Sequence, residues 1–173
     1  AEPLYARALA ILEKALGPDN AIVATVAINL AGLYRDQGAY AKAERLLERA
    51  LTIREKTLGP NHTEVAECLN NLAVLHRDQG AFAKAEPLYT RSLAIFEKAL
   101  RPDHPHLATS LNNLASLYQD QGSYAKAEPL FVRALAINEK ALGPDHRDVA
   151  LSLNNLAALY QIQSDFERAE PLY

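Results

Sequence analysis

Paired asparagines recur at a fixed spacing along this chain of 173 residues. The segment LNNLA starts at Leu69, and it returns 42 residues later at Leu111 and again at Leu153. A side-chain amide both donates and accepts hydrogen bonds, so it can hold the main chain of an extended segment without reading its side chains. Asparagine is a mediocre helix former, because its amide competes for nearby backbone groups. Its repetition within helical sequence therefore indicates a binding or packing role.

The histidines and the single cysteine do not combine into a catalytic or metal-binding group. His62, His104 and His146 recur at the same period, but packed helices lie about 8–10 Å apart and zinc needs its ligands at about 2 Å. Two of the histidines, His104 and His106, are close in sequence but have no third ligand. Cys68 has no histidine placed to activate it, and no phosphate-binding loop or hydrolase motif occurs. We expect no metal, no cofactor and no enzyme.

Composition excludes other classes of function. The net charge is −3, with 49% apolar and 23% charged residues, which is typical of a globular protein without the basic surface that nucleic acid or an anionic membrane attracts. The longest nearly uncharged stretch, 21–34, is too short to span a bilayer. One cysteine excludes an internal disulfide and fits a reducing compartment. We therefore expect a cytoplasmic protein that binds neither nucleic acid nor membrane.

The 42-residue period runs through the whole chain. Variants of AEPLY begin at Ala1, Ala43, Ala85, Ala127 and Ala169. Each period has two helical patterns, separated by a DQG-type segment, and LGPD or a variant of it separates one period from the next. The expected N-cap residues are Asp19, Asn61, Asp103 and Asp145. No segment has the pattern of a strand, so the chain is predicted to be an all-α solenoid.

We expect one array over residues 1–173. It would consist of a leftover second helix at 1–16, complete helix pairs at 19–57, 61–99 and 103–141, and a truncated pair at 145–173. Solenoid ends without a polar capping helix expose apolar surface, so end-to-end self-association is an expectation as well.

The units resemble tetratricopeptide repeats (TPR). The matching residues of one unit are Leu72, Ala73, Gly80, Phe82, Ala85, Tyr89 and Ser92, and those of the next are Leu114, Ala115, Gly122, Tyr124, Ala127, Phe131 and Ala134. The common TPR has 34 residues, and the longer form with LNNLA, YAKAEPLY and LGPDH is similar to the repeats of the kinesin light chain family. The resemblance implies a right-handed superhelix of stacked antiparallel helix pairs that serves as a scaffold or adaptor.

One face of each first helix carries the candidate site. At about 100° per residue, the apolar positions of residues 103–121 form one stripe and the second asparagine of LNNLA lies opposite it. The second asparagines of the four first helices are Asn29, Asn71, Asn113 and Asn155. The first asparagines, Asn70 and Asn112, lie on the flank of this face. Other candidate positions on the face are Thr25, Arg35, Arg77, Thr109, Ser116 and Gln119.

Two interpretations of these asparagines stay open. First helices of such solenoids line a concave surface that binds extended segments, and in the kinesin light chain family asparagines of this motif contact the peptide backbone. The resemblance therefore implies a protein or peptide partner in the groove. Alternatively, the amides bridge neighbouring helices, and the array is a structural spacer or a self-assembling superhelix. Acidic residues balance Arg35 and Arg77, so we do not extend the family's preference for acidic peptides to this chain.

Overall fold

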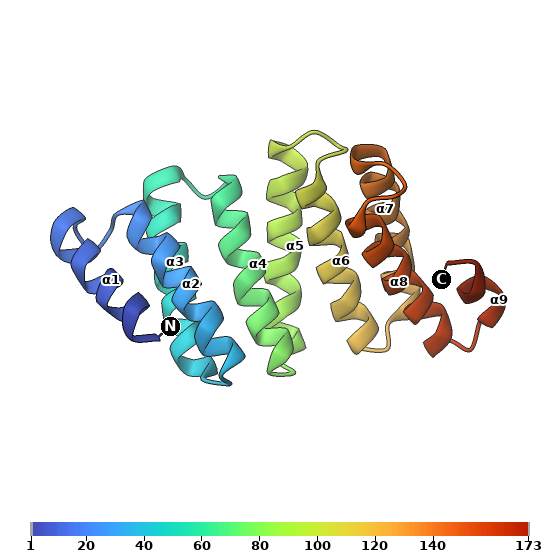
Figure 1. The fold of residues 1–173 in the computed structure, drawn as a ribbon, viewed down its shortest axis with the longest axis horizontal. Helices are drawn as coiled ribbons and strands as arrows, with labels where there is room; N and C mark the ends of the chain where they lie inside the picture. Colours follow the sequence, from blue (N-terminus) through green and yellow to red (C-terminus); the bar gives the residue numbers. More distant parts are fainter. Residues whose placement is uncertain (1, 173) are drawn as a thin grey trace. The chain divides into compact units, whose positions relative to one another are not determined.

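The computed structural model describes residues 2–172, and no strand occurs among them (Figure 1). Its helices are α1 (Glu2–Leu16), α2 (Ala21–Asp36), α3 (Tyr40–Leu58), α4 (Thr63–Asp78), α5 (Phe82–Ala99), α6 (Pro105–Asp120), α7 (Tyr124–Leu142), α8 (Arg147–Ile162), α9 (Phe166–Ala169) and a final 3-10 turn, η1 (Glu170–Leu172). The even-numbered helices are the first helices of the sequence repeat, which confirms the all-α helix-pair prediction.

The helices form two compact units, which are described separately. Unit 1 comprises residues 1–95 and unit 2 comprises residues 96–173, with the boundary inside α5. In unit 1, α2 packs against both α1 and α3, and α3 packs against α4. In unit 2, α7 packs against both α6 and α8, and α9 packs against α8. Each first helix of the repeat therefore buries its apolar stripe against second helices.

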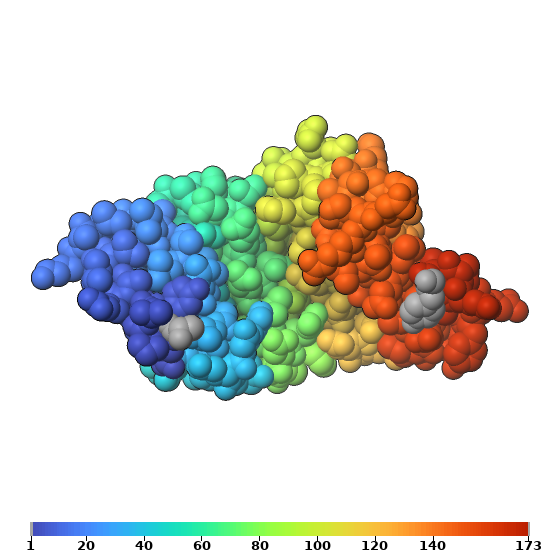
Figure 2. All heavy atoms as spheres, in the orientation of Figure 1, coloured from blue at the N-terminus to red at the C-terminus, as the bar shows by residue number. Residues whose placement is uncertain are grey.

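Alanines in the apolar stripes allow close packing of the helices. In unit 1, Ala24, Ala27 and Ala50 are fully buried in one cluster. In unit 2, Ala115 and Phe131 belong to the same buried cluster. Side chains fill the spaces that the ribbon leaves between α1, α2 and α3 (Figure 2). The stripe predicted for α6 is buried at Leu107, Ala108, Leu111, Leu114 and Ala115.

A single turn geometry ends the first helices. At the end of α2, the Ala39 N–H donates to the Tyr34 carbonyl at 2.8 Å and the Gly38 N–H donates to the Arg35 carbonyl at 2.9 Å. This pattern is a Schellman motif, which needs a left-handed residue, and Gly38 has φ +72°. At the end of α8 the same position is held by Ser164, with φ 60°. A residue with a Cβ is strained in this conformation.

The N-cap residues lie one position later than the sequence analysis predicted. They are Asn20, His62, His104 and His146. Each of these histidines accepts a hydrogen bond through Nδ1 from the N–H two residues onward, at 3.1–3.2 Å. A neutral imidazole nitrogen is an acceptor, so histidine replaces the asparagine amide here. Histidine is not among the commonest capping residues, so His62, His104 and His146 were passed over, whereas Asn20 is a common cap that directly follows the predicted Asp19. The periodic histidines therefore have a structural role.

A polar contact joins first helices to the second helix of the preceding repeat. Tyr34 donates to Glu2 Oε1 at 3.0 Å in unit 1, and Tyr160 donates to Glu128 Oε1 at 3.1 Å in unit 2. At the equivalent position, α4 carries His76, which is 5% exposed. This replacement puts a titratable ring where tyrosine otherwise supplies a hydroxyl.

His76 is less well satisfied than these tyrosines. Its Nε2 lies 3.8 Å from Glu44 Oε1, and its Nδ1 has no hydrogen-bond partner among the described residues. Burial lowers the pKa of His76, while the charges of Glu44 and Glu48 act in the opposite direction and that of Lys84 adds to the lowering. The ring is therefore held neutral below the pH at which an unfolded histidine protonates.

Replacing this ring by the tyrosine of the other repeats removes an acid-sensitive contribution to stability. In the unfolded chain the histidine protonates below about pH 6.5, and the folded chain takes up this proton only at lower pH. The free energy of unfolding therefore falls as the pH drops from about 6.5 towards the lowered pKa. We expect His76→Tyr to raise stability at pH 7 by about 1 kcal/mol and to flatten this part of the pH profile, measured by urea unfolding from pH 7.5 to 5. Tyr34→His is the reverse control, and an unchanged slope in His76→Tyr would contradict the assignment.

Candidate functional site

The predicted face of unit 1 contains a pocket of roughly 590 Å³. Its lining includes Tyr5, Ile28, Asn29, Gly32, Arg35 and Asn71. Asn29 is on α2 and Asn71 is on α4, so asparagines from successive first helices meet at one hollow. A Cβ added at Gly32 would meet no atom within 4 Å. The small residue one turn after Asn29 thus leaves the pocket open.

The charge of this pocket does not favour an acidic ligand. Arg35 lies 3.0 Å from Asp36 Oδ1 and 3.7 Å from Asp78 Oδ2. One guanidinium is therefore shared by two carboxylates. Because its charge is already compensated, a carboxylate brought to Arg35 would compete with both of them.

Unit 2 has its own pocket on the corresponding face, with a volume of roughly 230 Å³. Its lining residues are Pro105, Thr109, Asn112, Asn113, Asn138, Asp148, Leu151 and Asn155. Asn113 on α6 and Asn155 on α8 again bring second asparagines of successive first helices to one hollow. Polar side chains dominate this lining, and Asp148 is its charged residue.

Behind this pocket, one hydroxyl fixes the orientation of two amides. Ser152 donates to the Asp148 carbonyl at 3.0 Å. Its single proton is then used, so it accepts from Asn138 Nδ2 at 3.0 Å and from Asn112 Nδ2 at 3.4 Å. The amide oxygen of Asn112 consequently faces away from Ser152, and it is buried with no hydrogen-bond partner among the described residues.

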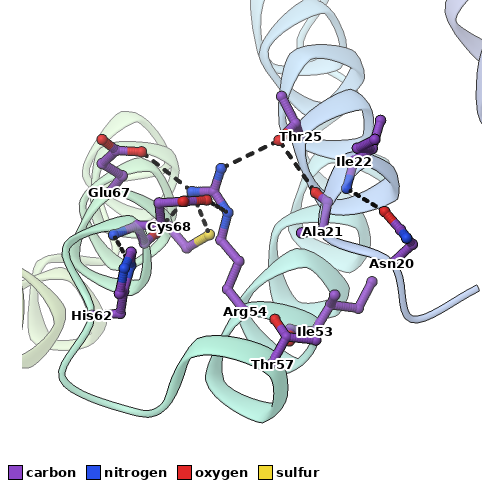
Figure 3. A network of polar contacts seen from close by, with 11 residues as sticks. Asn20, Ala21, Ile22, Thr25, Ile53, Arg54, Thr57, His62, Glu67 and Cys68 are labelled. Carbon is purple, nitrogen blue, oxygen red and sulfur yellow. Dashed lines mark hydrogen bonds and ion pairs between the residues drawn. The ribbon is translucent and has the colours of Figure 1, made fainter.

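The equivalent location in unit 1 is occupied by Arg54 of α3 (Figure 3). Its side chain is 6% exposed. One terminal nitrogen, NH1, donates to the Glu64 carbonyl at 2.8 Å and to Glu67 Oε2 at 3.3 Å, and the other lies 3.5 Å from Thr25 Oγ1. Nε lies 3.2 Å from Glu64 Oε2. The guanidinium thus joins α2 and α4 beneath the asparagine face.

This position and the residue ten places later change together from repeat to repeat. We call the two residues the junction pair. The pairs are Leu12 with Ile22, Arg54 with Glu64, Phe96 with His106, and Asn138 with Asp148. The rings of Phe96 and His106 meet edge to face at 5.8 Å, and Asn138 Nδ2 donates to the Asp148 carbonyl at 3.3 Å. Each repeat therefore has its own chemistry at one geometrically repeated place.

The thiol next to Arg54 is not a nucleophile. Cys68 is fully buried and lies 3.6 Å from a guanidinium nitrogen of Arg54. Burial raises the pKa of Cys68 to about 11, although the charge of Arg54 acts to lower it. The thiol therefore stays protonated at neutral pH, and protonated thiols react slowly.

Of the remaining predicted residues, Thr109 lines the pocket of unit 2 and the others lie outside the two pockets. In unit 1, Thr25 accepts a hydrogen bond from Arg54, and an Arg77 guanidinium nitrogen lies 4.0 Å from Asp78 Oδ1. Asn70 is half-buried and is not free of polar or electrostatic contacts. In unit 2, Ser116 donates to the Asn112 carbonyl at 2.9 Å. Gln119 is half-buried. Thr109, which does line the unit 2 pocket, donates to the Pro105 carbonyl at 3.3 Å.

The sequence analysis did not single out Arg54, Asn138 or Asp148. It considered one face of the first helices alone, whereas Arg54 and Asn138 come from second helices and Asp148 lies in the first turn of α8. The sequence does contain a sign of this site. The position of Arg54 and Asn138 is polar in these two repeats, whereas Leu12 and Phe96 occupy it in the others.

The Arg54 network is expected to tolerate loss of its buried cation better than loss of its acidic partners. The Glu64 and Glu67 side chains are 39% and 41% exposed, so water can solvate them when Arg54 is gone, and leucine already occupies position 12. We expect Arg54→Leu to change the free energy of unfolding by less than about 1 kcal/mol.

Removing only the acidic partners leaves a buried charge uncompensated. The double variant Glu64→Gln with Glu67→Gln should therefore cost about 2–3 kcal/mol. Urea unfolding measures both effects, and Glu55→Gln with Glu97→Gln is a control on exposed pairs. Equal stability loss in the two experiments would contradict this account.

A protein-family model matches the repeats of this chain. The family model for the tetratricopeptide repeat matches residues 1–56, 23–98, 78–137 and 106–173. No curated protein matches the chain. No described helix is long and apolar enough to cross a membrane.

Among solved structures, BtubC (BKLC) from P. vanneervenii is similar at a TM-score of 0.85 and 29% identity, covering 99% of this chain and 68% of that one. A kinesin light chain candidate with nearly identical TPR-like repeats from Podosopora anserina is similar at a TM-score of 0.80, and a substituted variant of it is similar at 0.82. Both are 29% identical to this chain, and each match covers 99% of this chain and 81% of the other. Because the repeat model matches from end to end, the chain belongs to the tetratricopeptide repeat family, in the form found in kinesin light chain-like proteins.

Proposed function

We propose that each unit of this array binds an extended segment of a partner protein along its asparagine face. Tetratricopeptide repeats are generally protein-interaction scaffolds. The finer proposal concerns where the segment binds and which groups hold it. No enzymatic activity is proposed, and a cytoplasmic location is part of the proposal because the one cysteine fits a reducing compartment.

The observation that carries the proposal is the meeting of two second asparagines at one pocket in each unit. Asn29 and Asn71 line the pocket of unit 1, and Asn113 and Asn155 line that of unit 2. Among the described residues, the amides of Asn29, Asn71 and Asn155 make no side-chain hydrogen bond. An amide with free donors and an acceptor can pair with both polar groups of a peptide backbone.

Bridging between helices, the other role considered for these residues, is taken by different asparagines in unit 2. Asn112 and Asn138 donate to Ser152 and so join α6, α7 and α8. The first asparagine of LNNLA thus has a packing partner at Asn112. This division of roles supports assigning ligand contact to the second asparagine.

Self-assembly is a second candidate, favoured by one exposed apolar face. Leu4 is 73% exposed and Ile11 is 56% exposed, and seven residues of spacing put them on one side of α1. A second copy of the chain would bury this face. The two candidates are compatible, because the asparagine faces lie on other helices.

Removing single amides tests the groove. We expect Asn71→Ala and Asn155→Ala to weaken binding of peptides selected from a random 12-residue display library about tenfold each, through loss of hydrogen bonds to the peptide backbone. Melting temperatures should stay the same or rise slightly, since alanine is the better helix former.

Asn154→Ala is the matched control, because that exposed first asparagine lines neither pocket. Isothermal calorimetry and thermal unfolding give the two readouts. A large fall in melting temperature with unchanged peptide affinity would assign these asparagines to packing instead.

Sedimentation velocity tests self-assembly. The intact chain should associate with rising concentration, and Leu4→Ser combined with Ile11→Ser should shift it towards the monomer, because the apolar area to be buried is lost. A strict monomer at the highest soluble concentration would exclude this candidate.

A further inference from the structure

We infer that the pocket of unit 2 receives the guanidinium of an arginine in the bound segment, an inference that rests on the groove function proposed above. The pocket lies between α6 and α8, with Thr109 and Leu151 on its walls and Asn138 and Asp148 towards α7. It supplies hydrogen-bond acceptors and one negative charge. Neither lysine nor arginine lines it.

Unit 1 shows what chemistry this place accepts, because the chain fills it there with its own arginine. Residues two repeats of 42 apart correspond. The corresponding pairs are Thr25 and Thr109, Arg54 and Asn138, Glu64 and Asp148, and Glu67 and Leu151. In unit 1 the guanidinium of Arg54 contacts Thr25, Glu64 and Glu67. In unit 2 the shorter Asn138 leaves the volume of roughly 230 Å³ open.

Two acceptors in this pocket have no hydrogen-bond donor among the described residues. The Asn112 Oδ1 atom is buried and unpartnered, and the hydrogen bonds of Ser152 turn it away from that hydroxyl. The Asp148 carboxylate has His146 Nδ1 at 3.8 Å, a contact that is attractive only when the histidine is protonated. A buried acceptor without a partner carries a desolvation penalty, which a donor from the ligand would remove.

The walls favour arginine over other side chains. Leu151 is 48% exposed and stands where unit 1 has Glu67, so it offers an apolar surface to the methylene stem of a long basic side chain. A planar guanidinium presents several donors at fixed angles towards a lining that holds both the Asn112 amide and the Asp148 carboxylate, whereas an ammonium is a compact point charge. The cation Lys140 lies 3.6 Å from Asp103 and does not line the pocket.

The test compares three host peptides that differ at one position. They are acetyl-GSGS-X-SGSG-amide peptides with arginine, citrulline or lysine at X, and citrulline keeps the shape of arginine without its charge. Calorimetry with the intact chain should show the arginine peptide binding about tenfold more tightly than the citrulline peptide and more tightly than the lysine peptide. The side-chain amide signals of Asn112 and Asn138 should shift in nitrogen-15 spectra with the arginine peptide alone.

Variants place this preference in the pocket. Asp148→Asn should reduce the preference in affinity for the arginine peptide over the citrulline peptide to about twofold or less, since the exposed carboxylate supplies the electrostatic attraction. Asp145→Asn, an exposed neighbour outside the pocket, is the matched control and should keep the ratio. Asn138→Arg combined with Leu151→Glu recreates the filled site of unit 1, and it should abolish the preference while citrulline binding persists.

The outcomes separate this inference from the proposed groove. Equal affinity for the arginine and citrulline peptides, or a preference that survives Asp148→Asn, overturns the arginine pocket and leaves the groove intact. Equal affinity for the arginine and lysine peptides overturns the guanidinium assignment. If none of the three host peptides binds but N-acetylarginine amide still shifts the amide signals of Asn112 and Asn138, the pocket stands and the extended-segment proposal fails. The absence of every such signal overturns both.

Discussion

The rest of each unit depends on the burial of first-helix apolar stripes between second helices. A single helix pair cannot cover both of its faces, so each repeat is stable only against its neighbours. Buried alanines such as Ala24, Ala27 and Ala115 keep the helices close enough for this packing. The opposite face of each first helix is left without a packing partner of its own. The asparagine faces are therefore a consequence of how the core is made.

Polar groups inside such packing must be satisfied by neighbours, and this chain satisfies them differently in its two units. Unit 1 closes its site with a guanidinium that joins α2, α3 and α4. Unit 2 uses a serine that accepts from two amides, which leaves the Asn112 amide oxygen without a partner among the described residues and a polar hollow in front. The exchange of one long side chain for a short one thus converts a structural contact into an open site.

The sequence predicts the helices and their pairing well, since these depend on period and apolar spacing, which neighbouring packing reinforces. The N-caps lie one residue later than predicted, and at three of them the cap is a histidine Nδ1, which the sequence does not distinguish from a packing residue. The pockets could not be predicted, because they depend on side-chain length at Asn138 and Gly32 and on the meeting of separate helices. The contact between Asn112 and Ser152 could not be predicted for the same reason, because only the fold brings these two residues together.

The variation of the junction pair also bears on how near-identical repeats find their correct neighbours during folding. Arrays of similar repeats are prone to misassembly, in which one repeat pairs with the wrong partner. A stacking error by one repeat would bring Arg54 to His106 in place of Glu64, and Phe96 to Asp148 in place of His106. The first mismatch leaves a buried cation without its counter-ion, and the second sets a carboxylate against a ring. Mismatched junction pairs thus destabilise an arrangement in which a helix packs against the wrong repeat, while the apolar core stays repetitive.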